Sequence, residues 1–214
     1  MRAYHFFKRI FDVIVSFIGL IMLIPIFIFL AVFIKLTSKG PVVYKHTRIG
    51  KNGKEFNVYK FRSMIVNARE QQNKGVPDEK LITTAGKFMR KTFLDETLQL
   101  LNIFKGDISF IGPRPFDKES YSMLVKKNPG WEKIFMTKPG LTCLDSVVEY
   151  VPENEKEKFA NLFGITKKTV NMEKSYKQGF LLDKYYTENE SFSLDFKLFF
   201  YTFFLMIKKI LFLK

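Results

Sequence analysis

The stretch VIVSFIGLIMLIPIFIFLAVFI, residues 13–34, decides how this chain folds, because it contains no charged residue and only Ser16 carries a hydrogen-bonding side chain. About 20 consecutive apolar residues are enough for a helix to cross the hydrocarbon core of a bilayer. A secretory signal peptide has a shorter apolar run with small residues at a cleavage site behind it, whereas the sequence KLTSKG follows here. We therefore expect a retained membrane segment.

Pro25 divides this apolar run into two pieces. At about 1.5 Å per residue, the first piece reaches only about 18 Å, against a hydrocarbon thickness of about 30 Å. Proline lacks a backbone donor, and its ring crowds the carbonyl four residues earlier, which belongs to Ile21. The sequence therefore predicts a sharp bend at Pro25, the membrane break.

Positive side chains flank the run on both sides. They are Arg2, Lys8 and Arg9 before it, and Lys35, Lys39, Lys45, Arg48 and Lys51 after it. Positively charged flanks stay in the cytoplasm, so both ends are expected there, as in a re-entrant hairpin of helix, break and helix. Proline is also tolerated in spanning helices, so the residues alone leave a single kinked span equally open.

The composition of the whole chain limits the classes of protein to which it can belong. Its 214 residues carry 35 Lys+Arg against 21 Asp+Glu, a net charge of +14, and 47% of them are hydrophobic. This length allows one compact domain with an appendage, and the hydrophobic content excludes global disorder. Cys143 is the single cysteine, which excludes an intrachain disulfide, and the sequence offers no structural zinc site.

Residues 1–36 are therefore expected to form a membrane anchor, and residues 37–214 one basic, membrane-associated domain. Within residues 42–64, apolar and polar residues alternate around Asn52-Gly53, which predicts a β-hairpin. Residues 68–80 predict a loop. The apolar residues from Phe88 to Leu101 fall at helical spacings and predict two helices, which the GD and GPRP elements close near residues 106–115, and residues 152–168 have helical character. The tail, residues 193–214, has broad aromatic faces between lysines and predicts an interfacial helix. The expected fold class is α+β and mainly helical, with a re-entrant anchor, a β-hairpin and interfacial amphipathic helices.

The excess of positive charge also indicates the kind of partner. A basic block beside an apolar anchor is suited to anionic lipid or to phosphate. Nucleic acid is the other standard partner of basic charge. Because the basic block here adjoins a lipid-inserted segment, we expect no nucleic-acid partner.

The stretch GKFMRKTFLDETLQLLNIFKGDISFIGPRP, residues 86–115, places acidic residues among cations. Asp95 and Glu96 are adjacent, so on a helix their side chains diverge by about 100° and hold separate roles rather than share one proton. Acidic residues at a helix start also have a purely structural role as caps, which the residues alone leave open. The same helix end favours bound phosphate. The GPRP element, residues 112–115, is expected to aim Arg114 in one direction.

These motifs resemble those of the bacterial sugar transferase family, in particular its minimal monotopic phosphoglycosyl transferases. The matching pieces occur in family order and are KRIFDVIVS (8–16), SKGPVVYKHTRIGKNGKEFNVYKFRSM (38–64), the stretch 86–115, KPGLT (138–142) and DKYYTENESFSLDFKLFF (183–200). The resemblance implies a re-entrant helix at the cytoplasmic face of the bacterial inner (plasma) membrane. It also implies transfer of a phosphosugar from a UDP-sugar to polyprenyl (undecaprenyl) phosphate, giving a polyprenyl-diphosphate sugar and UMP, as the first membrane step of polysaccharide or glycoprotein assembly.

The family's acidic pair matches Asp95 and Glu96. The resemblance implies that Asp95 is the catalytic nucleophile, which carries the phosphosugar covalently, and that Glu96 helps to hold Mg²⁺. A carboxylate that approaches a diphosphate is repelled by it, so cations are required nearby. The expected phosphate-binding residues are Lys60, Arg90 and Arg114, and further candidates for the site are Arg48, Arg62, Asp107 and Asp183.

The chain departs from the family pattern at three places. Leu98 stands where the family usually has proline in DELPQL, and Ile24 rather than serine precedes Pro25. Residues 141–170 diverge from the family, which leaves the identity of the sugar open. A non-catalytic basic scaffold on the membrane is the alternative hypothesis, and a homo-oligomer is allowed by the sequence.

Overall fold

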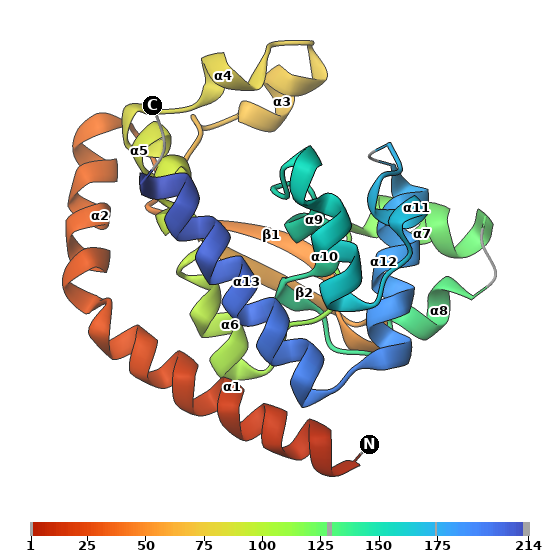
Figure 1. Ribbon diagram of the computed structural model, residues 1–214. Coiled ribbons are helices and arrows are strands. Elements are labelled where there is room, and N and C mark those ends of the chain that lie inside the picture. The colour runs from red at the N-terminus through yellow and green to blue at the C-terminus, as the bar shows by residue number, and fades with distance from the viewer. Residues whose placement is uncertain (1, 128–129, 174, 212–214) are drawn as a thin grey trace. The chain divides into compact units, whose positions relative to one another are not determined.

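The computed structural model describes residues 2–127, 130–173 and 175–211. The helices and strands (Figure 1) follow one another in the order α1 Arg2–Met22, α2 Ile24–Thr37, β1 Val43–Ile49, η1 Lys51–Gly53, β2 Glu55–Phe61, α3 Ala68–Asn73, α4 Asp78–Leu81, α5 Thr84–Thr92, η2 Leu94–Glu96, α6 Gln99–Lys105, β3 Ser109–Ile111, α7 Lys118–Lys127, α8 Trp131–Ile134, β4 Gly140–Thr142, α9 Leu144–Val148, η3 Glu153–Glu155, α10 Lys156–Phe163, α11 Lys167–Val170, α12 Tyr176–Asn189 and α13 Phe192–Leu211, where η denotes a 3-10 helix. The predicted fold class, mainly helical with a small β component, is confirmed.

The chain divides into two compact units. The larger unit consists of Met1–Val13, Thr47–Phe56 and Lys105–Lys214, and the smaller unit consists of Ile14–His46 and Asn57–Phe104. Helix α1 and both strands of the hairpin contribute residues to each unit.

Helices α1 and α2 form a bent pair. Their axes differ in direction by 59°, with Leu23 between them. Pro25 lies in the first turn of α2, where its missing N–H has no intrahelical partner to lose. The bend predicted at Pro25 is therefore confirmed, and the position of this break in a membrane stays a prediction. Among the described residues, no single helix is long and apolar enough to cross a bilayer, whereas this bent pair taken together has the required length and composition.

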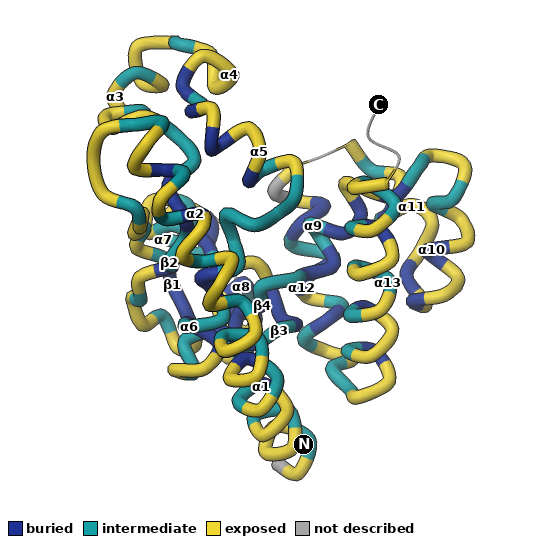
Figure 2. The backbone as a smooth tube through the Cα atoms, turned by 90° about the vertical axis from the view of Figure 1, so that its left-hand side faces the viewer, coloured by how far each residue is buried: buried dark blue, intermediate teal, exposed yellow. Residues whose placement is uncertain are grey.

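Most of the apolar side chains of the bent pair are exposed, and Figure 2 colours much of both helices as exposed. Phe17 and Ile21 of α1 are each 51% exposed, and Phe29 and Leu36 of α2 are 57% and 80% exposed. An apolar surface of this extent is typical of an element that faces lipid or a partner protein.

The predicted β-hairpin is confirmed, since β1 pairs with β2. Asn52 in the connecting turn has φ 58°, a left-handed conformation that asparagine tolerates better than most residues. The backbone N–H of Asn52 donates to the carbonyl of Phe135 at 2.6 Å, and that of Ile49 donates to the carbonyl of Phe116 at 2.8 Å. These bonds fix the turn within the larger unit.

A second sheet, which sequence patterns did not predict, consists of the parallel strands β3 and β4. Ser109 pairs with Gly140, and Ile111 pairs with Thr142. A Cβ atom on Gly140 would lie 2.1 Å from the backbone nitrogen of Gly112. Only glycine therefore permits the backbone segments at residues 112 and 140 to approach this closely. The pairing places the GPRP element beside the KPGLT element.

Each unit has its own hydrophobic core. The core of the smaller unit consists of Leu30, Ile34, Phe61, Ala85, Met89 and Leu98. In the larger unit, one core cluster joins α9, α10, α12 and α13, and another surrounds Trp131.

The structure bears on the predictions for residues 68–80 and for the C-terminal tail. Residues 68–80 were expected to form a loop, but they contain the short helices α3 and α4, whose polar sequences show no apolar period. The tail forms helix α13 as expected, and its residues 212–214 lie outside the described residues. The interfacial position of α13 stays a prediction.

Candidate active site

Asp95 and Glu96, the acid dyad, lie in η2 between α5 and α6 of the smaller unit. Helix α5 ends because Phe93 adopts a left-handed backbone with φ 58°, which is uncommon for a residue other than glycine. A 3-10 helix turns by about 120° per residue, so the two adjacent carboxylates point in different directions. The separate roles predicted for them stay a prediction.

Leu98 helps to hold the turn that carries the dyad. It is buried in the core of the smaller unit, against which Leu94 also packs. The family pattern has proline at this position, but leucine here packs in the core, two residues after Glu96 in the sequence. The departure from the pattern therefore leaves the dyad on an anchored segment.

Lys60 and Glu96 form an ion pair across this site. Lys60 is the penultimate residue of β2, and its Nζ lies 2.6 Å from Oε1 of Glu96. The other carboxylate oxygen of Glu96, Oε2, accepts a hydrogen bond of 3.0 Å from Nε2 of the buried Gln99. Both oxygens of Glu96 therefore have partners that fix their direction.

Asp95 has an unfavourable environment for its charge. Burial raises the pKa of Asp95 above its ordinary value, and the negative charge of Glu96 raises it further. The positive charges of Lys60 and Arg90 oppose this rise in the pKa. A carboxylate in such surroundings is poorly stabilised in its resting state, which is suited to a nucleophile.

Arg90 belongs to the same site. It lies in the last turn of α5, and its Nε donates a hydrogen bond of 3.1 Å to Oγ of Ser63. Its charge acts on Asp95 as described above. The structure thus brings together four predicted site residues of the smaller unit: Lys60, Arg90, Asp95 and Glu96.

The dyad fits a magnesium ion in one respect. Mg²⁺ is usually held by one or two carboxylates together with substrate phosphates, rather than by a cage of protein ligands. Among the described residues, no group of three or more His, Cys, Asp or Glu side chains could hold a metal ion by itself. The two carboxylates, whose mutual repulsion raises the pKa of Asp95, supply the hard oxygen donors that a cation bound with a diphosphate requires.

Arg114 belongs to the larger unit. Its Nη1 lies 3.2 Å from Oδ2 of Asp145, and its backbone N–H donates to Oδ2 of Asp183 at 3.2 Å. The carbonyl of the preceding residue, Pro113, accepts a hydrogen bond of 2.9 Å from Gly140 N. Backbone hydrogen bonds therefore hold the GPRP element in place. The Arg114 side chain extends from it toward Asp145.

Asp183 is fully buried, on α12. Burial raises the pKa of Asp183 well above its usual range, and the charge of Asp145 adds to this effect. Asp183 holds the backbone beside Arg114 and has no exposed carboxylate to offer a substrate. Cys143 nearby is also buried, and burial raises the pKa of its thiol to about 12, so its thiol does not ionise at neutral pH.

The remaining predicted site residues are Arg48, Arg62 and Asp107. Arg48 forms an ion pair of 3.5 Å with Asp117. The guanidinium of Arg62 is buried, and its Nη2 donates to the carbonyl and hydroxyl oxygens of Ser38 at 3.1 and 2.7 Å. Asp107 is half-buried in the turn before β3. For these residues, binding of substrate phosphate stays a prediction.

Three residues with contacts in these sites were missed by sequence reasoning, namely Ser63, Gln99 and Asp145. Ser63 stands in the motif YKFRSM near Lys60, and Gln99 stands in the motif DETLQL near Glu96. Their positions in these motifs could have identified them as candidates for contacts with the site. Asp145 lies in the divergent segment 141–170, and no local pattern connects it with Arg114.

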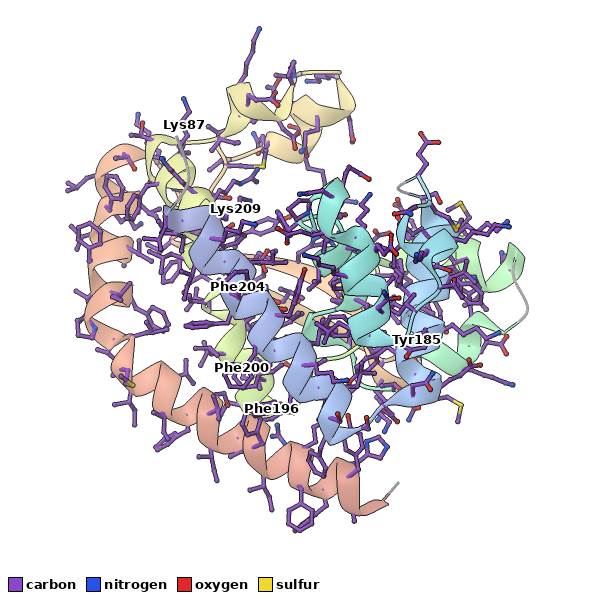
Figure 3. The ribbon with its side chains drawn as sticks, in the orientation of Figure 1. Lys87, Tyr185, Phe196, Phe200, Phe204 and Lys209 are labelled. Atoms are coloured by element: carbon purple, nitrogen blue, oxygen red, sulfur yellow. The ribbon has the colours of Figure 1, made fainter. Side chains whose placement is uncertain are left out.

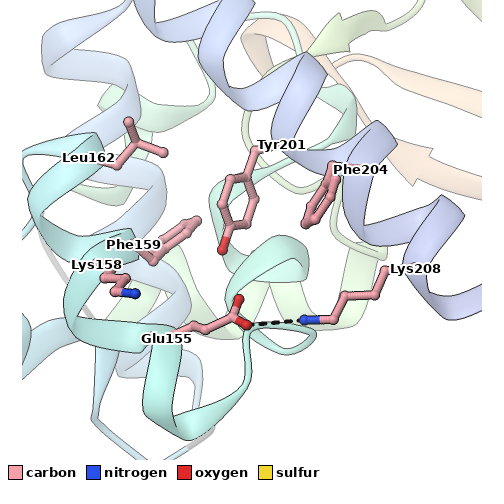
Figure 4. A pocket seen from close by; sticks show the side chains of 7 residues that line it. All are labelled: Glu155, Lys158, Phe159, Leu162, Tyr201, Phe204 and Lys208. Carbon is pink, nitrogen blue, oxygen red and sulfur yellow. Dashed lines mark hydrogen bonds and ion pairs between the residues drawn. The ribbon is translucent and has the colours of Figure 1, made fainter. Parts of the chain in front are cut away.

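The larger unit also contains a pocket of about 290 Å³ between α10 and α13 (Figure 4). It is lined by Glu155, Lys158, Phe159, Leu162, Tyr201, Phe204 and Lys208. Apart from the ion pair of Glu155 with Lys208, 3.0 Å apart, its walls are mainly aromatic and aliphatic. None of the predicted site residues lines this pocket.

Comparison with known proteins identifies similar chains. A family model described as bacterial sugar transferase matches residues 3–209. An undecaprenyl-phosphate galactose phosphotransferase of Salmonella typhimurium is 37% identical over 160 residues, which cover 67% of this chain and 33% of that protein.

Two further relatives have similar identities. A UDP-N-acetylgalactosamine-undecaprenyl-phosphate N-acetylgalactosaminephosphotransferase of Aeromonas hydrophila is 35% identical over 146 residues, covering 68% of this chain and 34% of that protein. An uncharacterized sugar transferase of Bacillus subtilis is 32% identical over 191 residues, covering 89% of this chain and 82% of that protein. The chain thus spans about a third of the length of the Salmonella and Aeromonas proteins and most of the length of the Bacillus protein.

Proposed function

Because this chain belongs to the bacterial sugar transferase family, we propose that it transfers a phosphosugar from a UDP-sugar to undecaprenyl phosphate. The products are an undecaprenyl-diphosphate sugar and UMP, and the reaction starts the assembly of a polysaccharide or another glycoconjugate. The names of the Salmonella and Aeromonas relatives describe transfers of this kind. The observation that carries the proposal is the meeting of Asp95 and Glu96 with Lys60 and Arg90 in the smaller unit.

In the proposed first half-reaction, a carboxylate oxygen of Asp95 attacks the β-phosphorus of the UDP-sugar. A bond forms between this oxygen and phosphorus, the bond between the β-phosphorus and the bridging oxygen breaks, and UMP leaves with that oxygen. The phosphosugar stays on Asp95 as an acyl phosphate. The raised pKa of Asp95, caused first by burial and then by Glu96, indicates a carboxylate whose charge is poorly stabilised and is readily shared with phosphorus.

The neighbouring cations make this approach feasible. Two unit charges of like sign repel by about 4 kcal/mol at 4 Å when the effective dielectric constant is about 20. Lys60 and Arg90 already act on the charge of Asp95, and a guanidinium can bind two phosphate oxygens at once. In the proposal, these two side chains bind the donor's diphosphate and offset its repulsion of Asp95.

A magnesium ion, when bound, neutralises charge on the diphosphate oxygens. We propose that Glu96 holds it, with Asp95 beside it. Gln99 orients the Glu96 carboxylate through its hydrogen bond of 3.0 Å. Lys60 is paired with Glu96 in the present structure and is expected to move to the donor's phosphates when the site is loaded.

In the second half-reaction, an oxygen of undecaprenyl phosphate attacks the phosphorus of the acyl phosphate. The bond from phosphorus to Asp95 breaks, so the carboxylate is restored and the lipid carries a diphosphate sugar. Splitting the transfer into two steps spares the enzyme from holding both large substrates at once. Arg114 is proposed as a further phosphate ligand, held by its contacts with Asp145 and Asp183.

The lipid substrate requires a membrane location, which we propose to be the cytoplasmic face of the bacterial inner membrane. The exposed apolar surface of the bent pair α1–α2 supports insertion as a re-entrant hairpin. On α13, Phe196, Phe200 and Phe204 follow one another along the helix, and each is more than half exposed (Figure 3). Such an aromatic face is suited to the bilayer interface.

The test is to incubate the purified protein with a panel of UDP-sugars, undecaprenyl phosphate and Mg²⁺, and to measure UMP. The proposal predicts UMP release with at least one donor, dependence on a divalent cation, and loss of release in Asp95→Asn. A non-catalytic membrane scaffold, the alternative, releases no UMP from any donor. Retained turnover in Asp95→Asn would eliminate the proposed nucleophile.

A further inference from the structure

Ser63, which lies two residues beyond the end of β2, contacts Arg90 directly. Its Oγ accepts the hydrogen bond of 3.1 Å from Nε of Arg90. In the part of the chain that the structure describes, this is the hydrogen bond that fixes the Arg90 side chain. It engages Nε and leaves the two terminal nitrogens of the guanidinium for another partner.

The backbone of Ser63 also fixes the start of α5. The N–H of Thr83 donates to the carbonyl of Ser63 at 3.1 Å, and the hydroxyl of Thr83 caps α5 by accepting from Gly86 N at 3.0 Å. A Cβ atom on Gly86 would lie 1.9 Å from the carbonyl oxygen of Ser63. Glycine is therefore required for α5 to approach Ser63 this closely.

This close approach determines where Arg90 lies. Residues four apart on a helix share one face, so the face of α5 that Gly86 presses against Ser63 also carries Arg90. Helix α5 is the helix on which Lys87 is labelled in Figure 3. Gly86 sets the distance between α5 and the backbone at Ser63, and the Ser63 hydroxyl then sets the orientation of the guanidinium.

We propose that Ser63 is a positioning residue for the phosphosugar transfer, whose hydroxyl holds Nε of Arg90 so that both terminal nitrogens face the donor's diphosphate. This inference rests on the proposed function. An arginine side chain has many rotamers, and fixing it before the substrate binds lowers the entropy lost on binding. The donor is therefore expected to bind a guanidinium that is already oriented for a two-pronged contact.

Ser63→Ala is a clean variant for testing this role. The contacts that hold α5 use the backbone carbonyl of Ser63, so the substitution removes only the hydroxyl. A hydrogen bond to a charged group has an effect of about tenfold on an equilibrium or rate. We expect kcat/KM for UMP release to fall about tenfold in Ser63→Ala, mainly through a higher KM for the UDP-sugar. Thr92→Val is the matched control. It removes a hydroxyl on α5 itself, which donates to the carbonyl of Phe88, and should keep wild-type kinetics.

A double-mutant cycle with Arg90→Ala separates positioning from general structural support. If Ser63 acts through Arg90, adding Ser63→Ala to Arg90→Ala changes kcat/KM by less than about twofold. If the two losses multiply in the double variant, Ser63 acts independently of Arg90 and the proposal is overturned.

A second readout does not depend on the reaction. In protein labelled with ¹⁵N-arginine, the Nε–H signal of Arg90 is identified by its loss in Arg90→Lys, and its exchange with water should accelerate in Ser63→Ala but not in Thr92→Val. Unchanged exchange in Ser63→Ala contradicts the positioning role, whereas accelerated exchange in a protein that releases no UMP from any donor contradicts the proposed function alone.

Discussion

Nζ of Lys60 lies 2.6 Å from Oε1 of Glu96, and both side chains are partly open to solvent, at 34% and 42% exposure. Exposed ion pairs of this kind contribute about 0–1 kcal/mol, so separating the two groups costs little. The pair therefore holds both residues near Asp95 but separates easily. In the proposed reaction, Lys60 then binds the incoming diphosphate while Glu96 binds the cation.

The acid side of the pH–rate profile should respond in opposite directions to the two members of the pair. Glu96 raises the pKa of Asp95, and Lys60 lowers it. Because the proposed mechanism requires Asp95 to be ionised when it attacks, Lys60→Met should move the acid limb of UMP release to higher pH, and Glu96→Gln should move it to lower pH. Each variant should also lose about 10²-fold in the rate on the plateau, as is usual when a group that stabilises transition-state charge is removed. Single-turnover UMP release across pH measures both effects, and shifts of the same sign would contradict the role of Asp95.

The ionised form of Asp95 should also lower the stability of the folded protein. Its pKa is raised in the folded protein, so ionising it weakens the fold: the penalty is absent below the unfolded-state pKa of about 3.9 and complete above the folded-state pKa. Asp95→Asn should therefore raise Tm at pH 7, by about 2 to 4 °C per kcal/mol of penalty removed, and the gain should vanish at low pH.

Asp117 is a matched control of opposite sign. Although burial acts against it, hydrogen bonds from Ser120 and the charge of Arg48 lower the pKa of Asp117. Its stabilising contribution is present above the unfolded-state pKa of about 3.9 and is lost as pH falls through the folded-state pKa. Asp117→Asn should lower Tm at pH 7, as measured by differential scanning fluorimetry in detergent. Equal shifts of Tm in the two variants would show that neither reflects ionisation.

Asp183 should tolerate loss of its charge but not of its acceptor. Burial holds the pKa of Asp183 well above its usual range, which favours the neutral acid, and Oδ2 accepts from the backbone N–H of Arg114. Asp183→Asn keeps an acceptor oxygen and should retain a rate of UMP release within about threefold of wild type. Asp183→Leu removes the acceptor of the Arg114 N–H, at a cost of about 1 kcal/mol for the lost hydrogen bond, and should be less active and less stable. A loss in Asp183→Asn as large as that in Asp95→Asn would mean that Asp183 acts as a charged group.

The topology of the bent pair can be tested with cysteines in a Cys143→Ala background. Ala3 lies at the start of α1, Lys54 follows α2 in the sequence, and both are exposed. A re-entrant hairpin predicts that Ala3→Cys and Lys54→Cys both resist an impermeant maleimide in intact spheroplasts and both react with a permeant one. Reaction of Ala3→Cys alone with the impermeant reagent would establish a kinked span instead.

Features with strong local signals could be predicted from the sequence. Pro25 within an uncharged run predicted the bend of α1–α2, and Asn52-Gly53 predicted the hairpin, because each residue restricts the backbone at its own position. The motifs that contain Lys60, Arg90, Asp95 and Glu96 predicted a set of residues that the structure brings together.

Features that depend on contacts distant in the sequence could not be predicted. The strands β3 and β4 have three residues each and pair across a long connection, so neither strand shows an alternating pattern of its own. The burial of Asp183 and the pairing of Arg114 with Asp145 follow from the packing of α9 and α12. Ser63 had a visible position in its motif, but its contact with Arg90 depends on the close approach at Gly86.

The central claim is that Asp95 becomes bonded to phosphorus. The most direct test is peptide mass spectrometry of the protein after incubation with its UDP-sugar donor and Mg²⁺, in the absence of undecaprenyl phosphate. The account predicts the added mass of the phosphosugar on the peptide that contains Asp95, its removal when undecaprenyl phosphate is added, and its absence in Asp95→Asn. Full transferase activity in a protein whose Asp95 stays unmodified under rapid quenching at low pH would contradict the account.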